Sequence, residues 1–176
     1  LRSVAMPTGA GNVQNLSAAE QLTKEVNQFS LRLDHRLTDS DQLFARFSTF
    51  GADETQPFGT SVLSESIVPG FGRTLDTKTK NLVASHTHVI GNSLLNEVRF
   101  GWMAVKGGQR SVNRGVNFAS QTGLLGVTTD SRDTGYPQVS TGGLFNAMGD
   151  PTSFVARDNQ HFELYENFSI ARSKHS

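Results

Sequence analysis

Apolar and polar residues alternate along several stretches of the chain, and the first clear one is Asn27–Leu37. Leu31 and Leu33 lie on one side of an extended segment there, whereas Arg32 and Asp34 lie on the other. Successive side chains of a β-strand point to opposite faces, so a period of two indicates a strand with one apolar and one polar surface. The next segment, with the same alternation, follows after a short polar turn.

The same reasoning predicts five strands in all. They are expected at about 27–37, 42–51, 79–90, 94–106 and 157–171. The residues before them, 1–26, are expected to be irregular, apart from a short helix that 18–22 could form. Polar turns rich in Asp, Ser, Asn and Gly separate the first strand from the second and the third from the fourth, which is typical of hairpins.

The connections between these strands alternate in length. The short ones are 38–41, 91–93 and a turn that opens at Arg172; the long ones are 52–78 and 107–156, with a short strand expected at Tyr136–Thr141. Loops above about 12–15 residues are uncommon in compact soluble domains. Outer-membrane barrels, however, join their strands by tight periplasmic turns and long extracellular loops. We therefore predict an all-β chain, an antiparallel up-and-down meander that forms part of the wall of a transmembrane β-barrel with two long extracellular loops.

In such a wall one row of each strand faces lipid and the other faces the lumen. The lipid-facing candidates are Phe29, Leu31, Leu33, Phe47, Val98, Phe100 and Trp102. The lumen-facing candidates are Arg32, Asp34, Arg36, Arg46, Glu97 and Arg99. These charges either line a substrate path or grip a plug, or they are ordinary lumen residues that pair across neighbouring strands. We expect the last, more ordinary role.

Two features fit this scheme less well. His86 and His88 share one face of the strand 79–90, a spacing suited to a metal, but the sequence offers no third ligand with convincing spacing and structural zinc needs four. We therefore expect no metal site and no cofactor. Both faces of this strand mix apolar and polar residues, so its facing stays open. Glu166 shares the apolar row of the last strand, where a charge is costly, and either a bulge or cover from a loop would explain it.

The composition argues against several classes of function. Sixteen basic and sixteen acidic residues cancel, and no basic run is present, so nucleic acid is not an expected partner. Cysteine is absent, which excludes disulfides and thiol chemistry. No apolar run reaches the roughly 18 residues of a transmembrane helix. No serine-hydrolase elbow, zinc-protease motif or P-loop occurs, so we expect no enzymatic activity. The chain starts at Leu1 without a signal-peptide pattern, and any export signal is expected upstream or is absent.

Four phrases of the sequence resemble a known family. They are NQFSLRLDHRL at 27–37 with DQLFARFS at 41–48, LLNEVRFG at 94–101, ENFS at 166–169, and RSKHS at 172–176. In this order they resemble hairpins, strands and a turn of TonB-dependent receptors. The closest subgroup is the Oar-like proteins, which carry a carboxypeptidase-regulatory-like domain at the N-terminus. Ser173 replaces the glycine usual at that turn, a mild departure.

The resemblance implies a transporter in the outer membrane of a Gram-negative-type bacterium, with a barrel of about 22 strands that is plugged in its lumen. The implied partners are outer-membrane lipid, the protein's own plug and remaining barrel strands, the TonB complex through an N-terminal part not included in this chain, and an extracellular ligand of the siderophore, carbohydrate or peptide class. The long loops are the expected contact surface, since loops on a rigid scaffold usually carry recognition.

Two alternatives stay open at this point. A secreted β-sandwich, serving as an adhesin or a carbohydrate-binding module, would bury the same apolar rows against a second sheet. An enzyme on a β scaffold would need a cluster that joins His86 or His88 to Asp and Ser side chains. For a barrel segment, in contrast, we expect that 1–176 does not fold alone, because its edges and apolar rows would be uncovered.

Overall fold

The computed structural model describes residues 9, 17–58, 68–130, 132–139, 148–150 and 155–171. The chain divides into two compact units. One consists of 1–25, 52–76 and 108–156, and the other of 26–51, 77–107 and 157–176.

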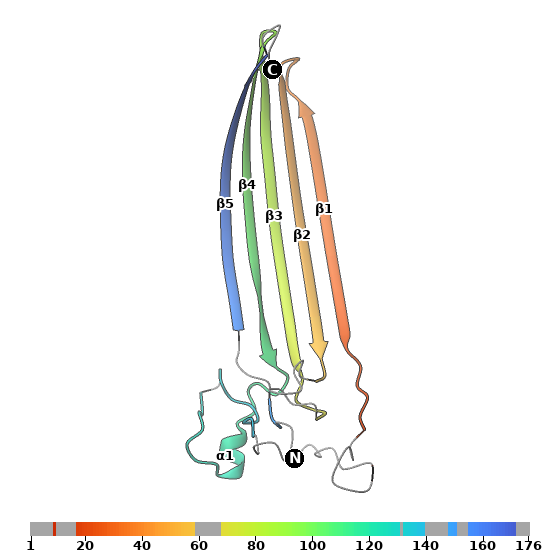
Figure 1. The fold of residues 1–176 in the computed structure, drawn as a ribbon, viewed down its shortest axis with the longest axis vertical. Coiled ribbons are helices and arrows are strands. Elements are labelled where there is room, and N and C mark those ends of the chain that lie inside the picture. Colours follow the sequence, from red (N-terminus) through yellow and green to blue (C-terminus); the bar gives the residue numbers. More distant parts are fainter. Residues whose placement is uncertain are drawn as a thin grey trace. The chain divides into compact units, whose positions relative to one another are not determined.

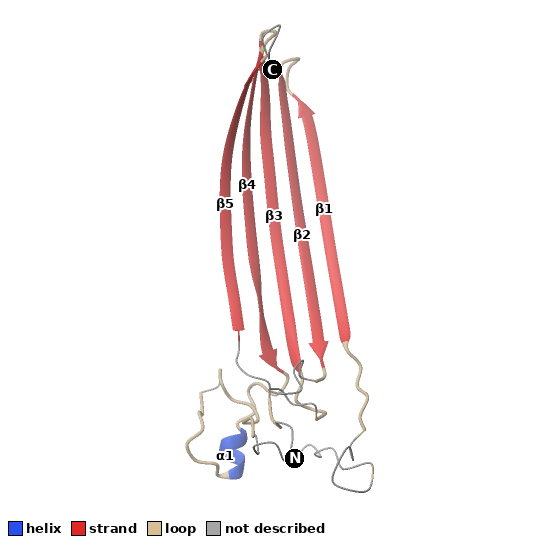
Figure 2. Ribbon diagram, in the orientation of Figure 1, coloured by secondary structure: helices blue, strands red, loops and turns tan. Residues whose placement is uncertain are grey.

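Five strands form one antiparallel sheet in which each strand pairs with its neighbours in sequence (Figures 1 and 2). They are β1 (Thr23–Arg36), β2 (Asp41–Gln56), β3 (Arg73–Ile90), β4 (Leu94–Ser111) and β5 (Val155–Ile170). A five-residue helix, α1 (Phe118–Thr122), lies in the connection between β4 and β5. The expected all-β meander is therefore confirmed. Within the described ranges, no helix combines the length and hydropathy that a membrane crossing requires.

Three of the strands extend further toward the long connections than the alternation predicts. β2 continues to Gln56, β3 begins at Arg73 and β4 continues to Ser111. Polar side chains hold these extensions together: Arg73 Nε donates to Gln56 Oε1 (2.7 Å) and Arg110 Nη2 donates to Asp76 Oδ1 (2.8 Å). In these extensions the backbone pairing continues but the apolar row does not. Hydrophobic periodicity therefore could not predict the added strand residues.

The expected boundaries also change at the first and last strands. Residues 18–22 are not helical, and β1 begins at Thr23 inside the segment that was expected to be irregular. β1 ends at Arg36, so Leu37 belongs to the turn, where its N–H donates to the Asp41 carbonyl (3.0 Å). β5 begins at Val155 and ends at Ile170, each bound within two residues of the expected one.

The expected strand at Tyr136–Thr141 is reduced to a single bridge between Val139 and Met148; its last two residues lie outside the described ranges. The turn expected from Arg172 lies outside them as well.

The described residues make a single-layered sheet. Ala104 and Ala119 are the buried apolar side chains among them, whereas Leu33 is 62% exposed and Leu164 is 75% exposed. A β-sandwich would cover these rows with a second sheet about 10 Å away, and the described part of the chain contains no second sheet. This comparison favours the barrel wall over the sandwich.

Candidate functional site

One face of the sheet carries a shallow apolar hollow that spans four strands. It is lined by Leu33, His35, Leu43, Phe44, Ala45, Ala84, Ser85, His86, Val98 and Phe100. Apart from Phe44 and Ser85, these residues are two apart within each strand, so they share one face of the sheet. By the same alternation, four other candidates expected to face lipid fall on this face: Phe29, Leu31, Phe47 and Trp102. The facing of β3 follows from His86 and His88, whose side chains contact Asp41, a residue of the same row as Leu43 and Ala45.

The opposite face carries the expected lumen charges. Arg32 Nε contacts Asp34 Oδ2 at 2.7 Å, and Arg99 Nη2 contacts Glu97 Oε1 at 2.6 Å. The Arg32 guanidinium also lies over the Phe44 ring, 4.4 Å from its centroid, a cation–π contact. The ion pairs join residues two apart on one strand, so the expectation that these charges pair across strands is wrong for both. Residues two apart share a face, and the long arginine side chain folds back to its neighbour.

The two remaining lumen candidates are Arg36 and Arg46. Arg36 Nη2 lies 3.0 Å from Asp39 Oδ1 in the turn between β1 and β2. Arg46 falls on the charged face by the alternation of β2.

Glu166, the charge that seemed misplaced on the apolar row, has a partner. Asn96 Nδ2 on β4 donates to Glu166 Oε1 at 3.0 Å. Asn96 lies near the start of β4 and Glu166 near the end of β5, and the bond replaces the bulge or loop cover suggested by the sequence. Asn96 shares the row of Val98 and Phe100, so the polar pair is a local interruption of that row.

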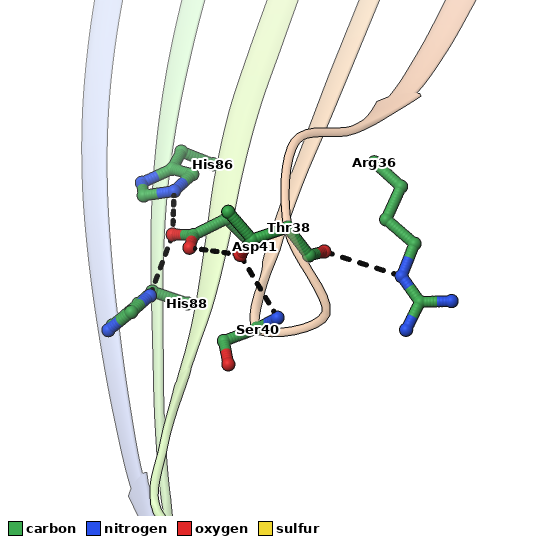
Figure 3. A network of polar contacts seen from close by, with 6 residues as sticks. All are labelled: Arg36, Thr38, Ser40, Asp41, His86 and His88. Atoms are coloured by element: carbon green, nitrogen blue, oxygen red, sulfur yellow. Dashed lines mark hydrogen bonds and ion pairs between the residues drawn. The ribbon is translucent and has the colours of Figure 1, made fainter.

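At the same end of the sheet, Asp41 joins the two histidines of β3 (Figure 3). Its Oδ1 atom lies 3.0 Å from His86 Nε2 and 2.7 Å from His88 Nδ1. The sequence offered no third ligand with convincing spacing, and the structure brings a third potential ligand, the Asp41 carboxylate, from the neighbouring strand. The sequence signal was weak, because Asp41 appeared to belong only to a polar turn.

The same cluster bears on the alternative of an enzyme, which would need His86 or His88 joined to Asp and Ser side chains. Histidine and aspartate do converge, but the hydroxyl in the network is that of Thr38, which donates to Asp41 Oδ2 (2.6 Å). A nucleophile relay needs the hydroxyl to contact the imidazole. In this cluster the Thr38 hydroxyl contacts the Asp41 carboxylate and the imidazoles contact that carboxylate's other oxygen, so the three groups do not form such a relay.

The connection between β4 and β5 forms a cavity of about 250 Å³. Tyr136 stands in its wall, with its ring 4.5 Å from the Phe118 ring and 5.6 Å from the Phe71 ring, measured between centroids. The short helix α1 positions Phe118: Asn117 Oδ1 accepts the Ser120 N–H at its start (3.0 Å). Five residues are too few to give a periodic signal, so the sequence did not reveal this helix.

Asp150, which lines this cavity, forms a buried polar pair with Asn113. Asn113 is 5% exposed and Asp150 is 9% exposed. Asn113 Nδ2 donates to Asp150 Oδ1 (2.7 Å) and to the Gly70 carbonyl (2.7 Å), and the Tyr136 N–H donates to Asp150 Oδ2 (2.6 Å). The Asp150 carboxylate therefore links Asn113 to the backbone of Tyr136, and Asn113 extends this network to Gly70.

Replacing this carboxylate should loosen the loop. In Asp150→Ala, Asn113 and the Tyr136 N–H lose a buried acceptor, and each unsatisfied donor costs about 1–3 kcal/mol. We expect proteinase K to cleave the loop of the purified full-length protein faster. Asp130→Ala is the matched control, because Asp130 contacts Arg132 in the same loop on an exposed surface. That hydrogen-bonded guanidinium lowers the pKa of Asp130 to about 2, yet such exposed pairs contribute little to stability. Equal cleavage rates of the two variants would contradict the role given to Asp150.

A single-layered antiparallel meander, with an apolar row on one face and charges on the other, defines the wall of an outer-membrane β-barrel. Comparison with known families agrees: the family model for an outer membrane beta barrel domain matches residues 1–176. The chain therefore belongs to this family, and its place is the outer membrane of a Gram-negative-type bacterium. No curated protein and no solved structure gave a significant match.

Proposed function

We propose that the chain is a wall segment of a TonB-dependent outer-membrane transporter for a large ligand. One observation carries the proposal. The phrases that resemble TonB-dependent receptors supply both faces of the wall, with Leu33 and Phe100 on the apolar face and the Arg32–Asp34 and Glu97–Arg99 pairs opposite. A charged interior beside a plug and an apolar exterior beside lipid are what such a transporter requires.

In this proposal the apolar face contacts acyl chains and the charged face borders the lumen. The apolar row ends in polar residues near the short turns, where Asp41, His86 and His88 cluster and Asn96 holds Glu166. Charged groups are costly in the middle of a bilayer but not at its surface. This end of the wall therefore lies at the periplasmic headgroup region, as the short turns also indicate.

Transport then follows the mechanism of TonB-dependent receptors. A ligand of the siderophore, carbohydrate or peptide class binds the outer loops and the lumen, and energised pulling by the TonB complex on the plug opens a path. The loop cavity beside Tyr136 and Phe118 is a suitable first contact, because aromatic rings next to hydrogen-bonding groups suit sugars and peptides. The wall performs no chemistry on the ligand, so no enzymatic activity is proposed.

Binding to TonB tests the proposal without knowledge of the ligand. The full-length protein, extracted from outer membranes in detergent, should bind the purified periplasmic domain of TonB from the same bacterium in isothermal titration. The matched control is a TonB-independent porin from the same membranes, which should not bind. Failure to bind would overturn the transporter assignment and leave the barrel wall intact.

A further inference from the structure

The turn between β1 and β2 fixes the position of the Asp41 carboxylate. The Leu37 N–H donates to the Asp41 carbonyl (3.0 Å), the Ser40 N–H donates to Thr38 Oγ1 (3.1 Å), and that hydroxyl donates to Asp41 Oδ2 (2.6 Å). Figure 3 shows the result: one carboxylate oxygen is held by the turn and the other points to the two imidazoles. The carboxylate is thus positioned before any further ligand arrives.

The histidines are positioned by the sheet. His86 and His88 are two apart on β3 and present their rings to the same side, with centroids 6.2 Å apart and an interplanar angle of 29°. The Val89 N–H donates to the Ser40 carbonyl (2.9 Å), which joins this end of β3 to the turn that carries Asp41. Three possible ligand atoms from two strands therefore converge: His86 Nε2, His88 Nδ1 and Asp41 Oδ1, all within 4.8 Å of one another.

From this convergence we propose that Asp41, His86 and His88 bind a divalent transition-metal ion of the zinc class. Ligands placed about 2.0–2.2 Å from a tetrahedral zinc lie roughly 3.3–3.6 Å from each other. The two nitrogens lie 3.0 and 2.7 Å from the shared oxygen, so a small rotation of the side chains opens room for the ion.

The ligand set also selects the kind of ion. Imidazole nitrogen favours zinc, copper and nickel over magnesium and calcium, which prefer oxygen ligands. The Thr38 hydroxyl on the far carboxylate oxygen provides the outer hydrogen bond that orients metal-binding carboxylates. Three protein ligands leave a position for water. The side chains of Asp41, His86 and His88 are 22%, 43% and 39% exposed, and in the proposed function they lie at the periplasmic headgroup region, so ions would enter from that side of the membrane. The bound ion would link β2 to β3 at the end of the lipid-facing row.

Zinc binding to the full-length protein, purified in detergent without a histidine tag, tests the site. In equilibrium dialysis against Zn²⁺, the variants His86→Gln, His88→Gln and Asp41→Asn should each weaken one equivalent of binding by at least about tenfold. His161→Gln is the matched control: His161 Nε2 also contacts a carboxylate, Glu163 Oε1 at 2.6 Å, but with no third ligand in the cluster among the described residues. It should bind Zn²⁺ as the parent protein does. If the cluster variants bind as much Zn²⁺ as the control, the site is overturned.

A second measurement needs no substitution and so does not depend on folding of the variants. Zn²⁺ should protect His86 and His88, but not His161, from carbethoxylation by diethylpyrocarbonate, as read by mass spectrometry of the parent protein. Equal modification of His86 with and without Zn²⁺ would overturn the proposal. Neither experiment involves TonB, so the metal site and the transport function can fail separately.

Discussion

An arginine in place of Phe100 should prevent the full-length barrel from reaching its normal folded yield. Phe100 lies in the apolar hollow with Leu33 and Val98, near the middle of β4. On the lipid face of a barrel, arginine at the bilayer midplane costs roughly 2–4 kcal/mol. The folded fraction can be measured in outer membranes from the faster migration of unheated barrel on denaturing gels, and its stability by urea unfolding in lipid vesicles.

Met103→Arg provides the matched control on the same strand. Phe100 is 39% exposed and Met103 is 40% exposed, so the two positions differ in face and hardly in burial. Met103 shares the row of Glu97 and Arg99, which the proposed function places on the lumen side, where a further charge is solvated. We expect near-normal folding of Met103→Arg. An equal loss of folding in both variants would contradict the assignment of the two faces.

The sequence was informative wherever one face of a strand is apolar. The alternation around Leu31 and Arg32 predicted both the strand and its two surfaces, since a strand repeats every two residues. It was uninformative for the facing of β3, whose two rows both mix apolar and polar residues. The neighbouring strand decides that question: His86 and His88 contact Asp41, a residue of the same row as Leu43.

The polar extensions of the strands could not be predicted for a related reason. Gln56 and Arg73 pair beyond the end of the apolar row, where no hydrophobic pattern distinguishes a strand from a loop. The cluster of Asp41, His86 and His88 could not be predicted because Asp41 and His86 are 45 residues apart in sequence. Only the pairing of β2 with β3 brings them together. This pairing sets the start of β2 beside the end of β3.

Residues 1–176 expressed alone should not yield a soluble, cooperatively folded monomer. Among the described residues, the sheet order leaves β1 and β5 paired on one side only, and unpaired strand edges promote association. The apolar row is equally uncovered, as the exposure of Leu33 and Leu164 shows. We expect the protein in the pellet after ultracentrifugation, and no cooperative thermal transition by circular dichroism in any soluble fraction.

Two triple variants of the isolated segment identify the cause of its insolubility. Serine at Leu33, Phe100 and Leu164 removes three large apolar side chains from the face assigned to lipid, whereas serine at Val83, Met103 and Tyr165 removes three from the other. If lipid normally covers the first face, only the first variant should raise the soluble fraction several-fold, because burial of apolar side chains drives the association. Equal solubility of the two variants would show that neither face is specialised for the membrane. A soluble, cooperative monomer of the unmodified segment would show that its apolar residues find cover within the chain, and the barrel wall would then be the wrong description.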